Sequence, residues 1–107
     1  MPVQELNDAT FKSCVLESAI PVLVDFTAEW CKPCKQLAPI VDQLSVELRS
    51  QLKVGRLDSE HNVATTMQFG VMGLPTLILF KNGQPVERLT GWVPKSKILE
   101  KLKKHLG

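Results

Sequence analysis

Two cysteines separated by two residues, Cys31 and Cys34, constrain this 107-residue chain more than any other feature. They follow the largely apolar run Val22–Phe26 and precede an amphipathic stretch, Lys35–Arg49, so they lie where a predicted strand passes into a predicted helix. Unpaired N–H groups and the helix dipole favour an anion at a helix N-terminus, so we expect Cys31 to be a thiolate near neutral pH. Cys34, one helical turn further on, is close enough to form a disulfide with Cys31. The pair therefore predicts a reversible two-electron switch.

The same spacing also occurs in zinc sites and in structural disulfides. A zinc site usually draws four ligands from a second such pair or from paired histidines, whereas the other candidates here, Cys14, His61 and His105, are scattered. A structural disulfide more often closes a larger loop and is one of several in a secreted chain. The first residues are acidic and polar, without the apolar run of a signal peptide or a membrane span, which indicates a cytoplasmic protein. In a reducing cytoplasm the motif favours redox chemistry, and we expect no metal and no cofactor.

Length and charge set wider limits on the chain. Its size fits a single domain over residues 1–107. A net charge of +2, with 22% charged residues, is ordinary for a soluble globular protein. The basic residues near the C-terminus alternate with leucines, as on the solvent-exposed face of a helix, and form no stripe interleaved with aromatics. We therefore expect a monomer that binds neither nucleic acid nor a membrane.

Hydrophobic periodicity predicts an α/β fold. A first helix, capped by Asn7 or Asp8, is expected to end near Ser18. Further helices are predicted over residues 35–49, 62–69 and 94–105, and strands over residues 21–27, 52–57, 76–80 and 86–89. Lys81-Asn82-Gly83 is expected to form the turn of a hairpin between the last two strands. The order β-α-β-α-β-α-β-β-α predicts a mixed central sheet flanked by helices on both faces.

Asp25 interrupts an otherwise apolar strand, and two interpretations are open. The side chain either points to solvent or lies buried. A carboxylate that stays charged and unpaired inside a protein is destabilising. The second interpretation therefore predicts a buried acid with a raised pKa beneath the cysteine pair.

The chain resembles the thioredoxin family from end to end. The matching residues are Asp25-Phe26, Ala28-Glu29-Trp30-Cys31, Pro33-Cys34-Lys35, Pro39, Asp58, Gly73-Leu74-Pro75-Thr76, Phe80-Lys81-Asn82-Gly83 and Gly91. The resemblance implies a thioredoxin fold and a general protein-disulfide reductase that carries electrons. It also implies two kinds of partner: proteins that contain disulfides, and a flavin- or ferredoxin-dependent thioredoxin reductase.

The resemblance also implies roles for the residues of the pair. Cys31 is the exposed nucleophile, and the more buried Cys34 resolves the mixed disulfide, so that the oxidised protein contains a Cys31–Cys34 disulfide. Asp25 accepts the proton of Cys34, through water. Arg56 stands near a position where the family often has Lys; its charge could lower the pKa of the acid, but an arginine cannot share a proton.

Further implied residues surround the pair. The Leu74–Pro75 bond is expected to be cis, with Pro75 facing the cysteines, and Pro33, Pro75 and Lys32 are expected to tune the redox chemistry. A shallow apolar groove around Cys31 would receive protein disulfides. Its expected rim consists of Trp30, Met72, Gly73, Leu74, Gly91 and Trp92.

Departures from the family pattern leave several roles open. Lys32 stands where the commonest motif has Gly, and is either a solvated side chain or a charge that favours the Cys31 thiolate and makes a slightly weaker reductant. Thr27 replaces the usual aromatic residue, and Trp92 either enlarges the docking surface or compensates for that loss. Cys14 lies on the apolar face of the first predicted helix, as a small buried residue or as a regulatory thiol.

Other functions predict other sequence features. An oxidase or isomerase would be expected to carry His between the cysteines and to be exported. A glutaredoxin would more often show Cys-Pro-Tyr-Cys. A binding module that clamps its partner without redox turnover would keep its activity after both cysteines are replaced by Ser, whereas an electron carrier would lose it.

Overall fold

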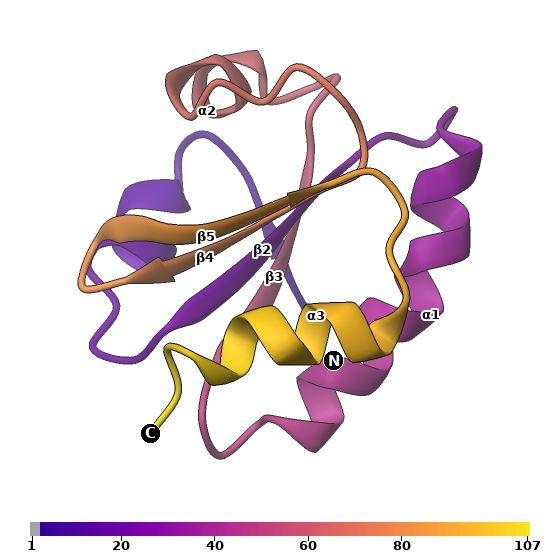
Figure 1. Cartoon of the computed structure of the whole chain (residues 1–107). Coiled ribbons are helices and arrows are strands. Elements are labelled where there is room, and N and C mark those ends of the chain that lie inside the picture. The colour runs from indigo at the N-terminus through magenta and orange to yellow at the C-terminus, as the bar shows by residue number, and fades with distance from the viewer. Residues whose placement is uncertain (1–2) are drawn as a thin grey trace.

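The computed structural model describes residues 3–107 and contains a five-stranded sheet with helices on both of its faces. Figure 1 shows the elements in chain order: β1 Val3–Leu6, η1 Lys12–Leu16, β2 Val22–Thr27, α1 Lys32–Glu47, β3 Lys53–Asp58, α2 Val63–Gln68, β4 Thr76–Lys81, β5 Gln84–Thr90 and α3 Lys95–Lys103. This order confirms the predicted α/β class. Within residues 3–107, no helix combines the length and the apolar character needed to span a bilayer.

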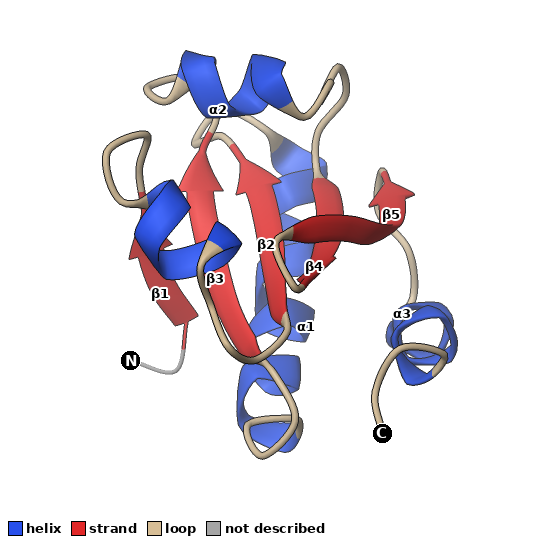
Figure 2. Cartoon of the chain, turned by 90° about the vertical axis from the view of Figure 1, so that its left-hand side faces the viewer, coloured by secondary structure: helices blue, strands red, loops and turns tan. Residues whose placement is uncertain are grey.

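The sheet has the strand order β1-β3-β2-β4-β5 and is mixed, as predicted. β1, β3 and β2 run parallel, whereas β4 pairs antiparallel with β2 and β5 pairs antiparallel with β4 (Figure 2). The predicted hairpin joins β4 to β5 through Asn82 and Gly83, whose φ angles of 54° and 77° suit a tight two-residue turn. Asp25 therefore lies on the central strand, opposite Arg56 of β3 and Leu77 of β4.

Successive side chains of β2 point to opposite faces of the sheet and so contribute to two separate hydrophobic clusters. Leu23 packs with residues of α1 and α3 such as Leu37 and Ile98, whereas Val24 and Phe26 belong to a cluster on the opposite face. That second cluster includes Phe11 and Val15 at η1, and in Figure 1 η1 and α1 lie on opposite sides of the strands. Because side chains two apart on a strand share a face, Asp25 points to the same side as Leu23, toward α1.

The first predicted helix differs most from the structure. Asn7 does cap a turn, since its Oδ1 accepts the Thr10 N–H at 2.9 Å. The helix that follows is short, Lys12–Leu16, and wider than an α-helix: the N–H of Glu17 bonds to the carbonyl of Lys12, five residues back, at 2.9 Å. The helix ends at Leu16, close to the predicted end near Ser18, but its wider hydrogen-bonding pattern was not predicted.

Candidate functional site

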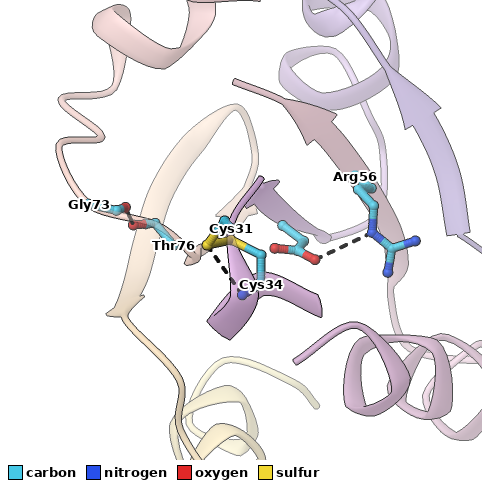
Figure 3. The surroundings of a disulfide bond; sticks show 6 residues. Cys31, Cys34, Arg56, Gly73 and Thr76 are labelled. Atoms are coloured by element: carbon cyan, nitrogen blue, oxygen red, sulfur yellow. Dashed lines mark hydrogen bonds and ion pairs between the residues drawn. A yellow bond between two sulfur atoms is a disulfide. The ribbon is translucent and has the colours of Figure 1, made fainter. Parts of the chain in front are cut away.

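The cysteine pair lies at the junction of β2 and α1. Cys31 is the N-cap residue of α1, with extended backbone angles, and Pro33 occupies the first turn. A disulfide joins Cys31 to Cys34, whose Cα atoms are 5.3 Å apart, and the Sγ of Cys31 also accepts the backbone N–H of Cys34 at 3.3 Å (Figure 3). The helix thus begins at Lys32, as expected for a first thiol at the helix N-terminus and a second one turn further on. This geometry confirms that the first sulfur faces the unpaired N–H groups of a helix N-terminus, which favour a thiolate.

The two cysteines differ little in exposure. In the oxidised structure Cys31 is 4% exposed and Cys34 is 2% exposed, so the expectation of an exposed Cys31 was wrong. The two residues instead line different openings. Cys31 contributes to a groove with Trp30 and Leu74, whereas Cys34 lines a separate cavity on the side of Arg56. What distinguishes Cys31 is its position in the groove.

Asp25 is buried, with 1% of its surface exposed, so the interpretation of a solvent-facing side chain is wrong. Burial raises the pKa of Asp25 to about 6, and the nearby Arg56 guanidinium opposes that rise. Arg56 donates from Nε to Asp25 Oδ2 at 3.4 Å and from Nη2 to Asp42 Oδ1 at 3.2 Å. The other oxygen of Asp25, Oδ1, has no hydrogen-bond partner among residues 3–107. One oxygen of this carboxylate is therefore free to accept a proton.

Figure 3 shows Arg56 on β3, with the ion pair between its Nε and Asp25 Oδ2 on the side that faces the cysteines. A cavity of about 310 Å³ borders both Cys34 and Arg56. Its remaining lining residues are Glu5, Thr27, Ala28, Glu29, Lys35, Ala38 and Asp58. A cavity of this size that is bordered by charged side chains such as Lys35 and Asp58 has room for water next to Cys34 and Arg56. The small Thr27 side chain forms part of its wall.

The groove that contains Cys31 has a volume of about 430 Å³. The structure brings together four of its expected rim residues, Trp30, Met72, Gly73 and Leu74, and adds three that were not expected, Ser59, Thr66 and Val71. These three residues belong to no sequence motif. They lie in α2 or in the segments that flank it, and the fold places them beside Cys31.

Two further rim residues and the proline lie beside this groove. Gly91 and Trp92 do not line it; Gly91 donates its N–H to the carbonyl of Pro75 at 2.7 Å, and Trp92 is 49% exposed. The Leu74–Pro75 bond is cis, as expected from the resemblance. Gly91 therefore holds the Pro75 segment from the side of β5.

The other potential metal ligands and the third cysteine form no part of the Cys31–Cys34 disulfide. Among residues 3–107, one group could place three ligand atoms within 4.8 Å of one another: Asp58, Glu60 and His61. It contains neither cysteine, and the bond between His61 Nδ1 and Asp58 Oδ2, 2.7 Å, raises the pKa of His61. Cys14 is half-buried and its Sγ accepts a bond from Gln4 Nε2 at 3.3 Å. Of these groups, Asp58 also lines the cavity that borders Cys34.

Comparisons with known proteins agree with this geometry. A family model described as Thioredoxin matches residues 2–104. The chain is 46% identical to Thioredoxin 1 of Synechococcus elongatus over 94% of each chain, and 43% identical to Thioredoxin of Haemophilus influenzae over 97% of each. It is also 42% identical to Thioredoxin M-type, chloroplastic, of Chlamydomonas reinhardtii, over 95% of this chain and 73% of that protein.

Proposed function

This chain belongs to the thioredoxin family, and on that premise we propose that Cys31 attacks target disulfides, that Cys34 resolves the mixed disulfide, and that Asp25 accepts the proton of Cys34. The protein is a thiol-disulfide oxidoreductase, a general protein-disulfide reductase and electron carrier that works by dithiol/disulfide exchange at Cys31 and Cys34. The observation that carries the assignment is the position of the Cys31 sulfur as the N-cap of α1, within hydrogen-bond distance of the Cys34 N–H.

The first step is attack by the Cys31 thiolate on one sulfur of the target disulfide. A bond forms between Cys31 and that sulfur, and the other target sulfur leaves as a thiolate. The N–H groups at the start of α1 stabilise the attacking anion. The groove around Cys31 supports this order, because a target that enters it meets Cys31 and not Cys34.

The second step is attack by Cys34 on the Cys31 sulfur. The Cys31–Cys34 disulfide forms, the target leaves with its second thiol, and Cys34 loses its proton. Asp25 suits the role of acceptor because it is directed toward α1, has one unbonded oxygen and has a pKa raised to about 6. The cavity borders Cys34 and Arg56, the residue bonded to Asp25, which supports transfer of the proton through water that enters there. Arg56 acts as a positioning residue, since it holds the other oxygen of Asp25.

The residues around the cysteine pair have two proposed roles: some tune its redox chemistry and others bind the target protein. We propose that Lys32, the exposed residue that follows Cys31, stabilises the thiolate by its charge. Pro33, between the two cysteines, and Pro75, in the cis Leu74–Pro75 bond, fix the backbone around the pair. Docking is assigned to the rim residues of the groove, with Gly91 and Trp92 at its margin. The rim residues are Trp30, Met72, Gly73 and Leu74.

The family implies disulfide-containing targets and a reductase that returns electrons to the pair. We further propose a single domain over residues 1–107 that acts as a monomer in the cytoplasm. The matched span of residues 2–104 supports one domain. The groove supports a monomer, because it must stay open to targets, and the bacterial relatives support a cytoplasmic location.

Insulin reduction tests the function directly. The protein is assayed with NADPH and a flavin-dependent thioredoxin reductase, and separately with ferredoxin and a ferredoxin-dependent reductase. Turnover with one of the two identifies the source of electrons. A variant with Ser at positions 31 and 34 serves as the control, and turnover by that variant would contradict the proposal.

A further inference from the structure

One wall of the Cys31 groove is the chain between α2 and β4. Residues 71–74 of this segment line the groove, and they belong to neither a helix nor a strand, so hydrogen bonds at the two ends of the segment fix its position. The end next to β4 is held twice. Gly91 of the β5 side donates its N–H to the carbonyl of Pro75 at 2.7 Å, and Thr76 donates from Oγ1 to the carbonyl of Gly73 at 2.6 Å.

Arg88 holds the end next to α2. It lies on β5 opposite Ile78, and its Nη2 donates to the carbonyl of Phe69, the C-cap residue of α2. The last carbonyls of a helix have no partner within the helix, and a cation beside them is also favoured by the helix dipole. The side chain of Arg88 therefore joins the sheet to the end of α2.

The chain turns sharply after Phe69, and the turn connects this bond to the groove. Gly70 has a φ of 63° and donates its N–H to the carbonyl of Met67 at 3.0 Å, while Val71 donates its N–H to the carbonyl of Thr66 at 3.0 Å. These two bonds form a Schellman turn, in which a Gly at positive φ ends the helix. Thr66 and Val71 both line the groove. A shift of the Phe69 carbonyl would therefore move two residues of the wall.

We propose that Arg88 is a positioning residue for target binding: by holding the carbonyl of Phe69, it keeps the α2 side of the groove wall in place beside Cys31. The proposal rests on the proposed function, because a target must enter this groove to reach Cys31. Arg88 does not line the groove, so it acts through the turn. The ring of Phe69 packs against Phe11 and Phe80, with centroids 5.4 and 5.0 Å apart. That packing remains when Arg88 is replaced, so the protein should stay folded while the turn loosens.

A large and a small disulfide distinguish positioning from chemistry. Arg88→Met keeps an apolar stem and removes the donor. Each protein is reduced, freed of reductant and mixed with excess insulin or with excess oxidised glutathione, a small disulfide that contacts little of the wall. In both reactions the dithiol becomes the Cys31–Cys34 disulfide and the substrate disulfide becomes two thiols. Acid quenching, alkylation and mass spectrometry follow the Cys31–Cys34 disulfide and give a rate constant for each substrate.

Arg88→Met should lower the rate constant for insulin roughly three- to tenfold, the effect of one lost hydrogen bond, and should leave that for glutathione unchanged. Amide hydrogen exchange at Gly70 and Val71 should become faster, because their hydrogen bonds close the turn, whereas exchange in β2 should not change. Arg49→Met is the matched control. It removes the same charge from an exposed residue that borders a different cavity, and it should keep both rate constants.

An unchanged rate constant for insulin in Arg88→Met would overturn the inference, as would unchanged exchange at Gly70 and Val71. Equal losses for insulin and glutathione would assign the effect to the cysteine pair or to stability, and an equal loss in Arg49→Met would assign it to net charge; either result would overturn the inference too. If the unmodified protein does not reduce insulin, the proposed function fails. If it does, and Arg88→Met reduces insulin as fast, the inference alone fails.

Discussion

Replacement of Asp25 by Asn should stabilise the protein at neutral pH. Burial raises the pKa of Asp25 from its ordinary 3.8 to about 6, a value that already includes the opposing effect of Arg56. A pKa that is higher by one in the folded state than in the unfolded state corresponds to ~1.4 kcal/mol, so the ionised carboxylate makes the folded state less stable by about 3 kcal/mol at pH 7. Asn has nearly the same shape as the protonated acid and carries no charge. The variant should therefore gain about 3 kcal/mol in its free energy of unfolding.

The gain should depend on pH in a defined direction. Because the folded pKa of Asp25 lies above the unfolded pKa, the folded protein binds more protons between about pH 4 and pH 6. The stability contributed by Asp25 is therefore highest in acid and falls as the pH rises through that window. Asn does not titrate, so the difference between the two proteins should shrink from about 3 kcal/mol at pH 7 to less than about 1 kcal/mol at pH 4.

Urea denaturation of the oxidised proteins at pH 4, 5, 6 and 7 measures this difference. With m-values of ~1–3 kcal/mol/M, the midpoint of the variant should rise by about 1–3 M at pH 7. Asp42→Asn is the matched control, because it removes the exposed carboxylate on the other side of Arg56 and should change stability by less than about 1 kcal/mol. A gain that is the same at pH 4 and pH 7, or an Asn variant that is less stable at pH 7, would refute the reasoning.

Two further predictions concern the charges around the pair. Lys32→Gln should make the protein a stronger reductant by roughly 10–20 mV at low salt, because the thiolate loses a favourable charge; redox titration against glutathione checks this, and an unchanged potential would mean that Lys32 is only solvated. The shift should shrink at high ionic strength. Arg56→Gln removes the cation that opposes the effect of burial, so the pKa of Asp25 should rise above about 6. A carbon-13 NMR titration of that carboxyl follows it, and a lower pKa would show that Arg56 does not stabilise the ionised form.

Helices and strands with a clear pattern of apolar residues could be predicted from the sequence. β2 begins one residue after the predicted Pro21 and ends at Thr27 as predicted, since a run of β-branched and apolar residues between turn residues allows little choice. The first helix was harder, because Phe11, Cys14 and Val15 have a spacing that suits the wider turn of η1 as well as an α-helix. The start of α1 followed from the cysteine motif and not from periodicity. Its first turn contains Lys32, Pro33 and Cys34, and these show no apolar periodicity.

The features of the site that depend on residues close together in the sequence could be predicted. Contacts between residues that are far apart in the sequence could not. The cysteine spacing indicated the disulfide and its place at a helix N-terminus. The apolar neighbours of Asp25 indicated its burial. Its proximity to Arg56 was implied only by the family resemblance, because that contact depends on the register of β2 with β3. Ser59 and Val71 reach Cys31 only through the tertiary structure. A pattern along one strand or helix contains no information about such distant neighbours.

The division of labour between the two cysteines is the central claim, and trapping of a mixed disulfide tests it most directly. Cys34→Ser and Cys31→Ser are prepared in a Cys14→Ser background, so that each variant keeps one cysteine. Each is reduced, mixed with insulin and analysed by mass spectrometry without reductant. The account predicts a covalent adduct on Cys31 in the Cys34→Ser protein and little adduct in the Cys31→Ser protein. Equal adduct formation by the two variants, or adduct formation mainly on Cys34, would contradict it.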